Sequence, residues 1–348
     1  MPRKKSVTLQ SLASELGLSI HTVSKALRGM PGMSEETRHA VLLTARKLGY
    51  RTKDQEQSLA IEHIPLFPNR QRKFKLVFFG DMGYFRLNQI LLEGLQEKLS
   101  EYGHTIDMLM IPATFEKGQT FDTWVDNNNL MYADGLFIPP MTGSIYEERL
   151  LKLPLPRILF NFPPPAAEVD SVIWDVGTAV RQSVRHLLAN GHRNILYIGN
   201  IHRHRGFGLR WQSFVDTMRE AGLEAAPDRH ITDAYPEKEA WIAQVQSKLS
   251  SLRATAIMSG VHHNLAWIYH ACSTLGKQIP DDYSLISMQH EEDGFLPQLS
   301  RPILVIRETG IRGAERMLWR LANPNLPYEH TMLQGTFFAG ETVKPPKA

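Results

Sequence analysis

The spacing of hydrophobic positions divides the chain into two parts. Residues 7–50 read VTLQSLASELGLSIHTVSKALRGMPGMSEETRHAVLLTARKLGY, with apolar residues three and four positions apart in three short runs. From about residue 74, short apolar runs, from KLVFFGD to YSLISM and ILVIRE (residues 303–308), alternate with longer amphipathic stretches. The first spacing is typical of amphipathic helices, and the second is typical of strands that alternate with helices. The pattern therefore predicts an all-helical N-terminal module followed by an α/β core.

Capping residues bound the three helices predicted in residues 7–50. Thr8, Ser19 and Ser34 suit the N-cap position, and a glycine follows each helix. Helices this short are not stable alone, so they must share one core. We expect that core to consist of Leu12, Ala13, Leu16, Val23, Leu27, Val41, Leu42, Ala45 and Leu48.

The second predicted helix keeps a polar side that suits the DNA major groove. Ile20 can contact a thymine methyl group, and His21 and Lys25 can donate hydrogen bonds to a guanine edge. Neighbouring hydroxyl and basic side chains can bind phosphate oxygens. The predicted DNA-binding residues are Thr8, Ser19, Ile20, His21, Thr22, Ser24, Lys25 and Arg28, with Leu59 in the linker that follows.

Positive charge is concentrated in the same part of the chain. Residues 1–60 hold ten Lys and Arg against five Asp and Glu, a net charge of +5. The whole chain carries +3, so the remaining 288 residues carry −2. Phosphate binding favours such a distribution. The alternative is a helical hairpin whose basic face is only solvated.

Residues 7–50 resemble the DNA-binding headpiece of the lac-repressor/galactose-repressor family of bacterial transcription regulators. The matching words are VTLQSLA, GLSIHTVSKAL, SEETR and KLGY. The words YADGLFIP, ANGHRNILYIG, LRWQSF and IPDDYSLISM resemble the family's effector-binding core, in the family's order. The resemblance implies a homodimeric repressor that binds a double-stranded operator and a small-molecule effector. It also implies a core of two doubly wound parallel-sheet lobes, periplasmic-binding-protein-like, with a ligand cleft between them.

This resemblance and the pattern of elements predict the domain organisation. Residues 1–52 form the helix-turn-helix headpiece, residues 53–73 a hinge helix and linker, and residues 74–348 the effector-binding and dimerisation core. We expect lobe 1 to span about 74–171 and 301–326, and lobe 2 to span about 172–300 and 327–348.

The linker departs from the family pattern. The resemblance puts Leu59 at the position of a leucine that inserts into the minor groove at the operator centre. Thr52, Glu56 and Gln57 differ from the usual residues, and the stretch IPLFPNRQRK is longer than the family normally has. The alternative for Leu59 is packing against its counterpart in the dimer.

Effector-binding candidates follow the predicted strands, because ligands of such sheets bind beyond the strand carboxyl ends. They are Asp81, Tyr84, Phe85, Asn161, Arg210, His262, His263 and Gln289. Arg210 matches the family arginine that grips the effector; the alternative for it is a salt bridge between the lobes. Sugar-binding members usually carry acids where Asn161, His263 and Gln289 stand. The loss of three acids beside a retained arginine predicts an anionic effector, such as an acidic sugar derivative.

No metal site, cofactor or catalytic motif is predicted. The histidine pairs in HRHR and HH lack the usual zinc spacing, and the motifs GxSxG, HExxH and the phosphate-binding glycine loop are absent. Two alternatives remain open: a solute-binding protein without a regulatory role, and an enzyme acting on a modified sugar or acid.

The remaining composition indicates a cytoplasmic protein. The single cysteine, Cys272, cannot form an internal disulfide, which suits a reducing compartment. No apolar run approaches the ~18 residues of a membrane span, and no signal peptide is recognisable. The C-terminal FFAGETVKPPKA lacks a heptad pattern, so a coiled-coil tetramer is not expected.

Overall fold

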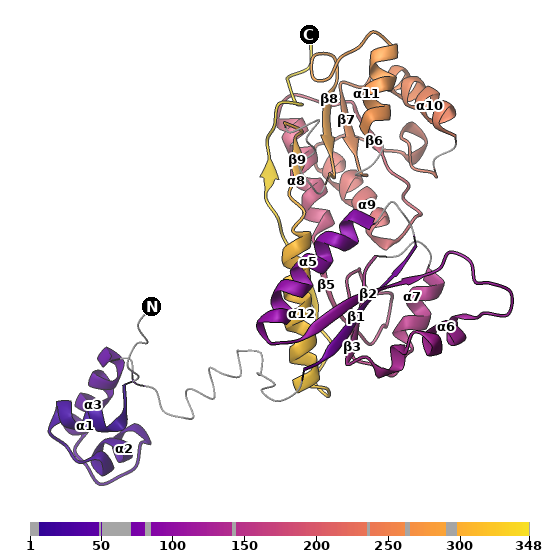
Figure 1. The fold of residues 1–348 in the computed structure, drawn as a ribbon. Helices are drawn as coiled ribbons and strands as arrows, with labels where there is room; N and C mark the ends of the chain where they lie inside the picture. Colours follow the sequence, from indigo (N-terminus) through magenta and orange to yellow (C-terminus); the bar gives the residue numbers. More distant parts are fainter. Residues whose placement is uncertain are drawn as a thin grey trace. The chain divides into compact units, whose positions relative to one another are not determined.

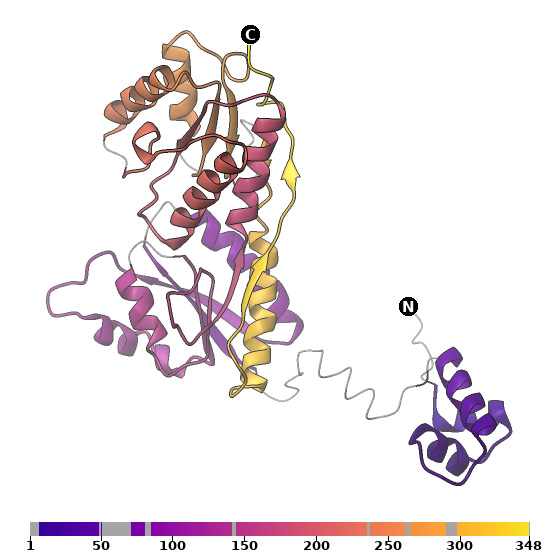
Figure 2. The ribbon, with the colours of Figure 1, turned by 180° about the vertical axis from the view of Figure 1, so that it is seen from behind.

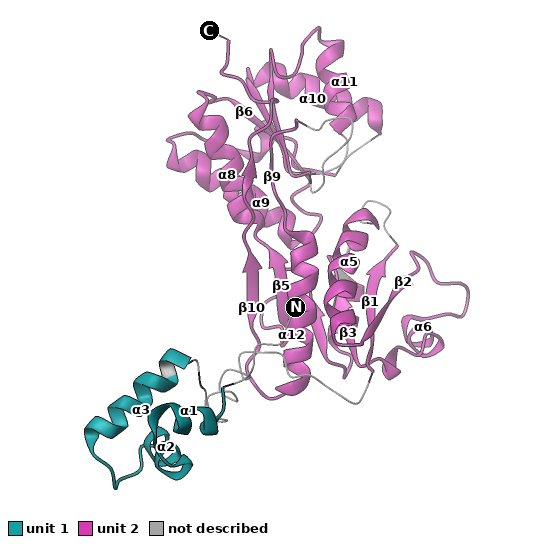
Figure 3. Cartoon of the chain, turned by 60° about the vertical axis from the view of Figure 1, so that its left-hand side comes forward, with its two compact units in different colours: residues 1–66 teal, residues 67–348 magenta. Residues whose placement is uncertain are grey.

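The structure is a computed structural model that describes residues 7–48, 50, 71–80, 85–140, 144–234, 237–261, 265–289 and 298–347. The chain divides into two compact units, residues 1–66 and 67–348 (Figure 3). Residues 51–70, which hold most of the predicted hinge helix and linker and include Leu59, lie outside the described residues.

The described part of the first unit folds into the three predicted helices: α1 Leu9–Leu16, α2 Ile20–Leu27 and α3 Glu35–Leu48. All three expected N-caps are confirmed. The hydroxyl oxygens of Thr8, Ser19 and Ser34 accept hydrogen bonds from the backbone N–H three residues later, at 3.2, 3.1 and 3.2 Å. Gly17 closes α1 at a φ of 61°, in the left-handed region that favours glycine.

The predicted headpiece core is confirmed in part. Leu12, Ala13, Val23, Val41 and Ala45 are buried, with Leu16 and Leu27 packed around them. The expectation that Leu42 and Leu48 join this core is wrong, since they are 44% and 37% exposed. Helix α3 has 14 residues, whereas α1 and α2 have 8 each. Val41 and Ala45 already pack against the two shorter helices, so Leu42 and Leu48 face away from them.

The second unit begins with a sheet in which the described strands are all parallel (Figure 1). Its order is β10-β5-β4-β3-β1-β2. Strand order therefore reverses between β1 and β3, the point where doubly wound sheets bind ligands. The strands are β1 Lys73–Phe79, β2 Thr105–Ile111, β3 Gly135–Ile138, β4 Arg157–Leu159, β5 Asp170–Trp174 and β10 His330–Leu333.

Helices cover both faces of this sheet. They are α5 Phe85–Glu101, α6 Phe121–Asn127, α7 Ser144–Leu151 and α12 Ile306–Ala322, with a 3-10 turn at Leu130–Tyr132. Helices α5 and α12 approach closely through glycines: a Cβ on Gly94 would lie 2.0 Å from the Arg307 carbonyl oxygen, and one on Gly310 would lie 2.3 Å from that of Leu91. No side chain fits at either contact.

A buried charge network fastens α12 to β5. The Asp170 carboxylate is fully buried and accepts hydrogen bonds from Arg316 Nε and Nη2 at 2.9 and 2.6 Å. Arg320 Nε and Nη2 donate to the same carboxylate at 2.5 and 3.2 Å. The Glu329 backbone N–H adds a further bond at 3.0 Å. Two guanidinium groups thus share one carboxylate at the amino end of β5.

The second lobe is a smaller parallel sheet in the order β6-β7-β8. A parallel bridge joins Ile198 of β6 to Ile231, so strand order reverses between β6 and β7. Its elements are α8 Val176–Ala189, β6 Ile195–Ile198, α9 Arg205–Glu220, a 3-10 turn at Pro227–Arg229, α10 Lys238–Ser251, β7 Ala256–Ser259, α11 Leu265–Thr274 and β8 Ser284–Ser287. An antiparallel pair, β9 Arg301–Pro302 and β11 Phe337–Phe338, flanks it.

The chain passes between the lobes at three places, each a few residues later than predicted. The first follows Trp174, because β5 belongs to the first sheet. The second lies between β9 and α12, and the third follows Leu333, because β10 pairs with β5. Figures 1 and 2 show the yellow C-terminal segment running along both lobes.

One predicted strand is wrong. Residues 303–308, ILVIRE, were expected to form a strand, but α12 already begins at Ile306. Within this apolar run Leu304 and Ile306 are both buried, one shortly before the helix and one at its first position. Otherwise the predicted fold class, a helical headpiece and two parallel-sheet lobes, is confirmed. Among the described residues, no helix is both long and apolar enough to span a membrane.

Candidate functional site

The polar side of α2 lies on the surface of the headpiece. Val23 and Ala26 are buried against α1 and α3, so the opposite side of the helix is left outside. Ile20 is 45% exposed at the first position of α2, beside the exposed His21. Lys25 follows one turn later and is half-buried. The described geometry therefore leaves these side chains available to a groove.

Several predicted DNA-binding residues also have structural roles. The hydroxyls of Thr8 and Ser19 are engaged in caps, and Ser19 Oγ lies 2.9 Å from Thr22 Oγ1. Arg28 Nε donates to the Ser24 carbonyl oxygen at 3.2 Å, which folds that side chain back along its own helix. Phosphate contacts by these groups stay a prediction.

Sequence reasoning missed Arg38. Its Nη1 and Nη2 donate to the carbonyl oxygens of Gly29 and Met30 at 3.3 and 3.0 Å. An arginine on α3 thus fixes the connection that follows α2. This contact could not be predicted from sequence, because the partners of Arg38 are backbone carbonyl oxygens, which leave no residue pattern.

In the core, Phe85, Asn161, Arg210 and Gln289 lie in described parts of the chain. The other predicted effector-binding residues, Asp81, Tyr84, His262 and His263, lie outside the described residues. Phe85 is the first residue of α5 and is 52% exposed.

Arg210 lies at the point where strand order reverses in the second lobe. Its Nη1 donates to the Gly260 carbonyl oxygen at 2.6 Å, directly after β7. Its guanidinium lies 4.6 Å from the centroid of the Phe207 ring. The buried hydroxyl of Tyr197 is nearby: burial raises the pKa of Tyr197, and the charge of Arg210 partly opposes this. Arg210 is therefore a preorganised cation at a position typical of ligand sites.

Asn161 belongs to a hydrogen-bonded cluster that sequence reasoning did not identify. Its Nδ2 donates to Glu147 Oε2 at 2.9 Å, and its Oδ1 accepts from the Phe162 N–H at 2.9 Å. Glu147 is on α7, and its side chain is only 3% exposed. No sequence pattern singles out Glu147, because no helix is predicted at the position of α7.

Arg205 completes this cluster from the other lobe. It is the first residue of α9, and its Nη2 donates to Glu147 Oε1. Its Nε donates to the Phe162 carbonyl oxygen at 2.6 Å. We call Glu147, Asn161, Phe162 and Arg205 the lobe junction. It links the carboxyl end of β4 in the first lobe to the amino end of α9 in the second.

Glu147 changes the charge argument for the effector. The sequence suggested that three acids were lost while a cation was kept. The structure places a buried carboxylate beside Asn161, already paired with an arginine. Preference for an anion then depends on Arg210 rather than on a general loss of acids.

Gln289 follows β8 and carries an open acceptor. Its Oε1 is buried and receives no hydrogen bond from any described residue. A buried acceptor without a donor is unfavourable, so a ligand hydroxyl or amine there would be stabilising.

The histidines near α9 make local contacts. His204 Nδ1 accepts from the Gly206 N–H at 3.2 Å as the N-cap of α9, and the His202 N–H donates to Asn200 Oδ1 at 3.0 Å. Within the described ranges, no three His, Cys, Asp or Glu residues gather as metal ligands.

Two family models match the core. The model described as "Periplasmic binding protein-like domain" matches residues 184–343. The model described as "Periplasmic binding proteins and sugar binding domain of LacI family" matches residues 88–261, half of the chain.

Known proteins match over nearly the full length. Catabolite control protein A of Priestia megaterium is 24% identical over 325 residues, which cover 91% of this chain and 93% of that protein. The solved structure of a transcriptional regulator CelR–cellobiose complex aligns with a TM-score of 0.67 and 17% identity, covering 97% of this chain and 99% of that one. The lac repressor dimer bound to operator and the anti-inducer ONPF aligns with a TM-score of 0.65 and 16% identity, covering 98% and 100%. On the family match and the two-lobed fold, this chain belongs to the LacI family.

Proposed function

We propose that this protein is a sequence-specific DNA-binding repressor of transcription, whose affinity for its operator is switched by a small molecule bound between the core lobes. The observation that carries the proposal is the surface of α2. Its apolar side is fully used in the headpiece core, while Ile20, His21 and Lys25 remain on the other side. The net charge of +5 over residues 1–60 supports contact with phosphates.

In this proposal the protein acts as a homodimer on a roughly palindromic DNA site, because two headpieces double the contact with DNA. One of the similar structures is a repressor dimer bound to operator. Leu59 of each linker probes the central minor groove. The second helix of each headpiece lies in the major groove, and the remaining predicted side chains contact phosphates. Because the protein acts on operator DNA, this proposal places it in the cytoplasm.

The effector is proposed to contact Arg210 and Gln289 of the second lobe, and the lobe junction, which contains side chains of both lobes. A ligand that favours one lobe arrangement changes the spacing of the two linkers. Operator affinity then changes by the coupling free energy, typically ~1–3 kcal/mol. Binding of neutral sugars and of their acid derivatives to the core tests whether Arg210 selects an anion.

Selection from a random-sequence DNA pool at physiological salt tests the function. The proposal predicts one enriched, roughly palindromic sequence. A solute-binding protein without a regulatory role would bind ligands and enrich no sequence. An enzyme would turn over a candidate ligand; the relatives matched are named as regulators, which favours the repressor.

A further inference from the structure

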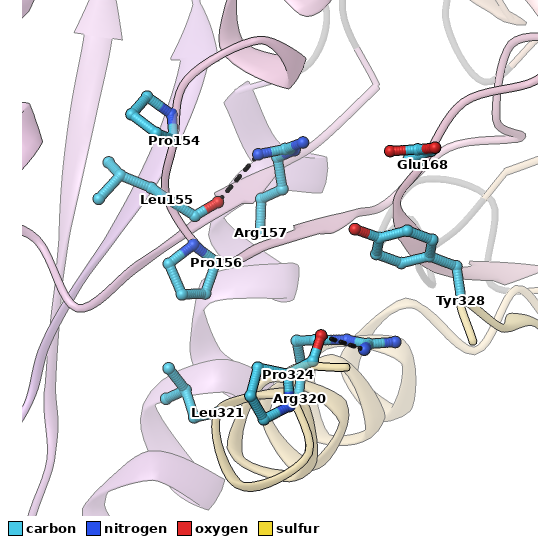
Figure 4. A pocket seen from close by; sticks show the side chains of 9 residues that line it. All are labelled: Pro154, Leu155, Pro156, Arg157, Glu168, Arg320, Leu321, Pro324 and Tyr328. Atoms are coloured by element: carbon cyan, nitrogen blue, oxygen red, sulfur yellow. Dashed lines mark hydrogen bonds between the residues drawn. The ribbon is translucent and has the colours of Figure 1, made fainter. Parts of the chain in front are cut away.

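A hollow lies in the first lobe, at the end of the sheet away from the lobe junction. Its volume is about 360 Å³, within the range of ~300–1,000 Å³ common for small-molecule sites. Its walls come from the start of β4, the approach to β5 and the end of α12 (Figure 4). The lining residues are Pro154, Leu155, Pro156, Arg157, Glu168, Arg320, Leu321, Pro324 and Tyr328.

The hollow and the predicted effector site lie at opposite ends of β4. Arg157 begins this strand and Asn161 follows it. Four chain positions separate them, so at ~3.3 Å per residue of extended chain their backbones lie up to ~13 Å apart. One small molecule therefore does not fill both places.

Arg157 is the positively charged group of the hollow that a ligand can reach most directly. Its Nη1 donates to the carbonyl oxygens of Leu153 and Leu155 at 2.6 and 3.0 Å. Its Nε is buried and has no hydrogen-bond partner among the described residues. Burial lowers the pKa of Arg157, and Tyr328 and Glu168 oppose this only in part. A half-buried guanidinium without a close carboxylate in the described chain is a group that an anion would stabilise.

The second arginine in the lining is not available to a ligand. Its donors go to Asp170 and to four backbone carbonyl oxygens, those of Asn323, Pro324, Leu326 and Pro327. Its guanidinium also lies 4.8 Å from the centroid of the Tyr328 ring. The Arg320 side chain is therefore fixed by its own hydrogen bonds, and it holds the loop after α12 in place.

The remaining walls are apolar, with one acid at the rim. Three prolines, Leu321 and the Tyr328 ring surround the space. Figure 4 shows the Tyr328 hydroxyl and the Glu168 carboxylate facing Arg157 across it. Glu168 is exposed, and it also borders an adjoining hollow of about 260 Å³ together with Arg157. Its exposed carboxylate forms no ion pair with Arg157 within 4 Å among the described contacts.

We propose that this hollow is a second small-molecule site, which binds a small carboxylate through Arg157 and packs its apolar body against Pro156, Leu321 and Tyr328. The planar guanidinium matches the geometry of a carboxylate. The site is independent of the proposed function, because its lining residues all lie in the first lobe, at the opposite end of β4 from Asn161.

Phenylacetate and its neutral analogue phenylacetamide are suitable probes, since they differ only in the group that would face Arg157. Ligand-observed NMR titrations of the full chain should show phenylacetate binding at least about tenfold more tightly than the amide. No phenylacetate binding up to about 10 mM, or equal binding of both probes, would overturn the proposal.

Variants locate the binding. Leu321→Trp fills the hollow without touching Arg157, and it should weaken phenylacetate binding at least about tenfold. Leu275→Trp makes the same exchange at an exposed position of the second lobe and should leave binding as it is. Glu168→Gln removes a like charge and should tighten binding of the acid, an effect that general destabilisation cannot produce.

Arg157→Gln should remove the preference for the acid over the amide. If this variant does not fold, Leu321→Trp and Glu168→Gln still decide whether the probe binds in the hollow. Binding that survives Leu321→Trp, or that weakens in Glu168→Gln, contradicts the proposed site. Binding lost only in Arg210→Ala would assign the probe to the effector site instead.

Discussion

Arg205 at the start of α9 donates a hydrogen bond to the buried carboxylate of Glu147 on α7, so an ion pair joins the two lobes of the core. The same guanidinium holds the Phe162 carbonyl oxygen. A contact of this kind connects lobe arrangement to a few side chains beside the predicted effector position.

Glu147→Gln should destabilise the core, because it leaves Arg205 without its counter-ion. It also removes one of the two carboxylate oxygens that accept hydrogen bonds from Arg205 and Asn161. The Arg205 side chain is 29% exposed, so we expect a loss of about 1–3 kcal/mol rather than the full penalty of a buried charge. Urea unfolding of the purified chain measures this.

Asp122→Asn is the matched control for this change. It breaks an exposed ion pair with Arg149 whose side chains are 76% and 40% exposed, and its effect should stay below about 0.5 kcal/mol. Equal losses in the two variants would show that the lobe junction does no more than a surface pair.

Arg210→Ala should abolish the response to effector while operator binding stays intact. The guanidinium lies at the point of strand reversal in the second lobe, far along the chain from the headpiece. Titrating effector candidates against a preformed protein–DNA complex measures the response. Loss of operator binding in a folded variant would mean that Arg210 supports the fold or the dimer rather than the ligand.

Asp170→Asn should be strongly destabilising, since it leaves Arg316 and Arg320 buried without their shared carboxylate. The expected loss is about 3–5 kcal/mol in the free energy of unfolding. Asp107→Asn, at an exposed pair with Lys75, serves as the reference and should change it by less than about 0.5 kcal/mol. A small loss at both positions would contradict the role given to the network.

Stability should fall with acidification through His230. Burial beside Trp211 and Phe214 lowers the pKa of His230 to about 4, and its Nδ1 accepts the Tyr197 N–H at 3.1 Å. Between the unfolded value of about 6.5 and the folded value, the unfolded chain binds the extra proton. The stabilising contribution is therefore complete above pH ~6.5 and decreases toward pH ~4, by about 3 kcal/mol in all.

His230→Asn isolates this effect, because the amide oxygen can replace Nδ1 as acceptor and does not titrate. The difference in unfolding free energy between pH 7 and pH 5 should be smaller in the variant than in the wild type. An unchanged difference would assign the acid sensitivity to other histidines.

The headpiece could be predicted from sequence because its signals are local. Caps such as Ser19 and the spacing of Leu12, Val23 and Val41 depend on neighbours a few residues away. The outward position of Leu42 could not, since it depends on where the shorter helices end.

The effector region was harder because its contacts join distant segments. Arg205 and Glu147 are 58 residues apart, and no periodicity relates them. Strands β5 and β10 were also missed, because each is short and gains its partner across the chain. Asn161 and Gln289 could be predicted because ligands bind beyond the carboxyl ends of parallel strands. Glu147 and Arg205, which hold Asn161 and Phe162 in place, could not.

Operator binding by Lys25→Ala tests the central claim most directly. Lys47→Ala is the matched control, because it removes the same charge from the exposed end of α3. We predict that Lys25→Ala weakens binding to the selected operator by about 1–3 kcal/mol and relaxes the preference at one base pair, whereas Lys47→Ala keeps the base preference. Equal and sequence-independent losses in both variants would contradict the placement of α2 against base edges.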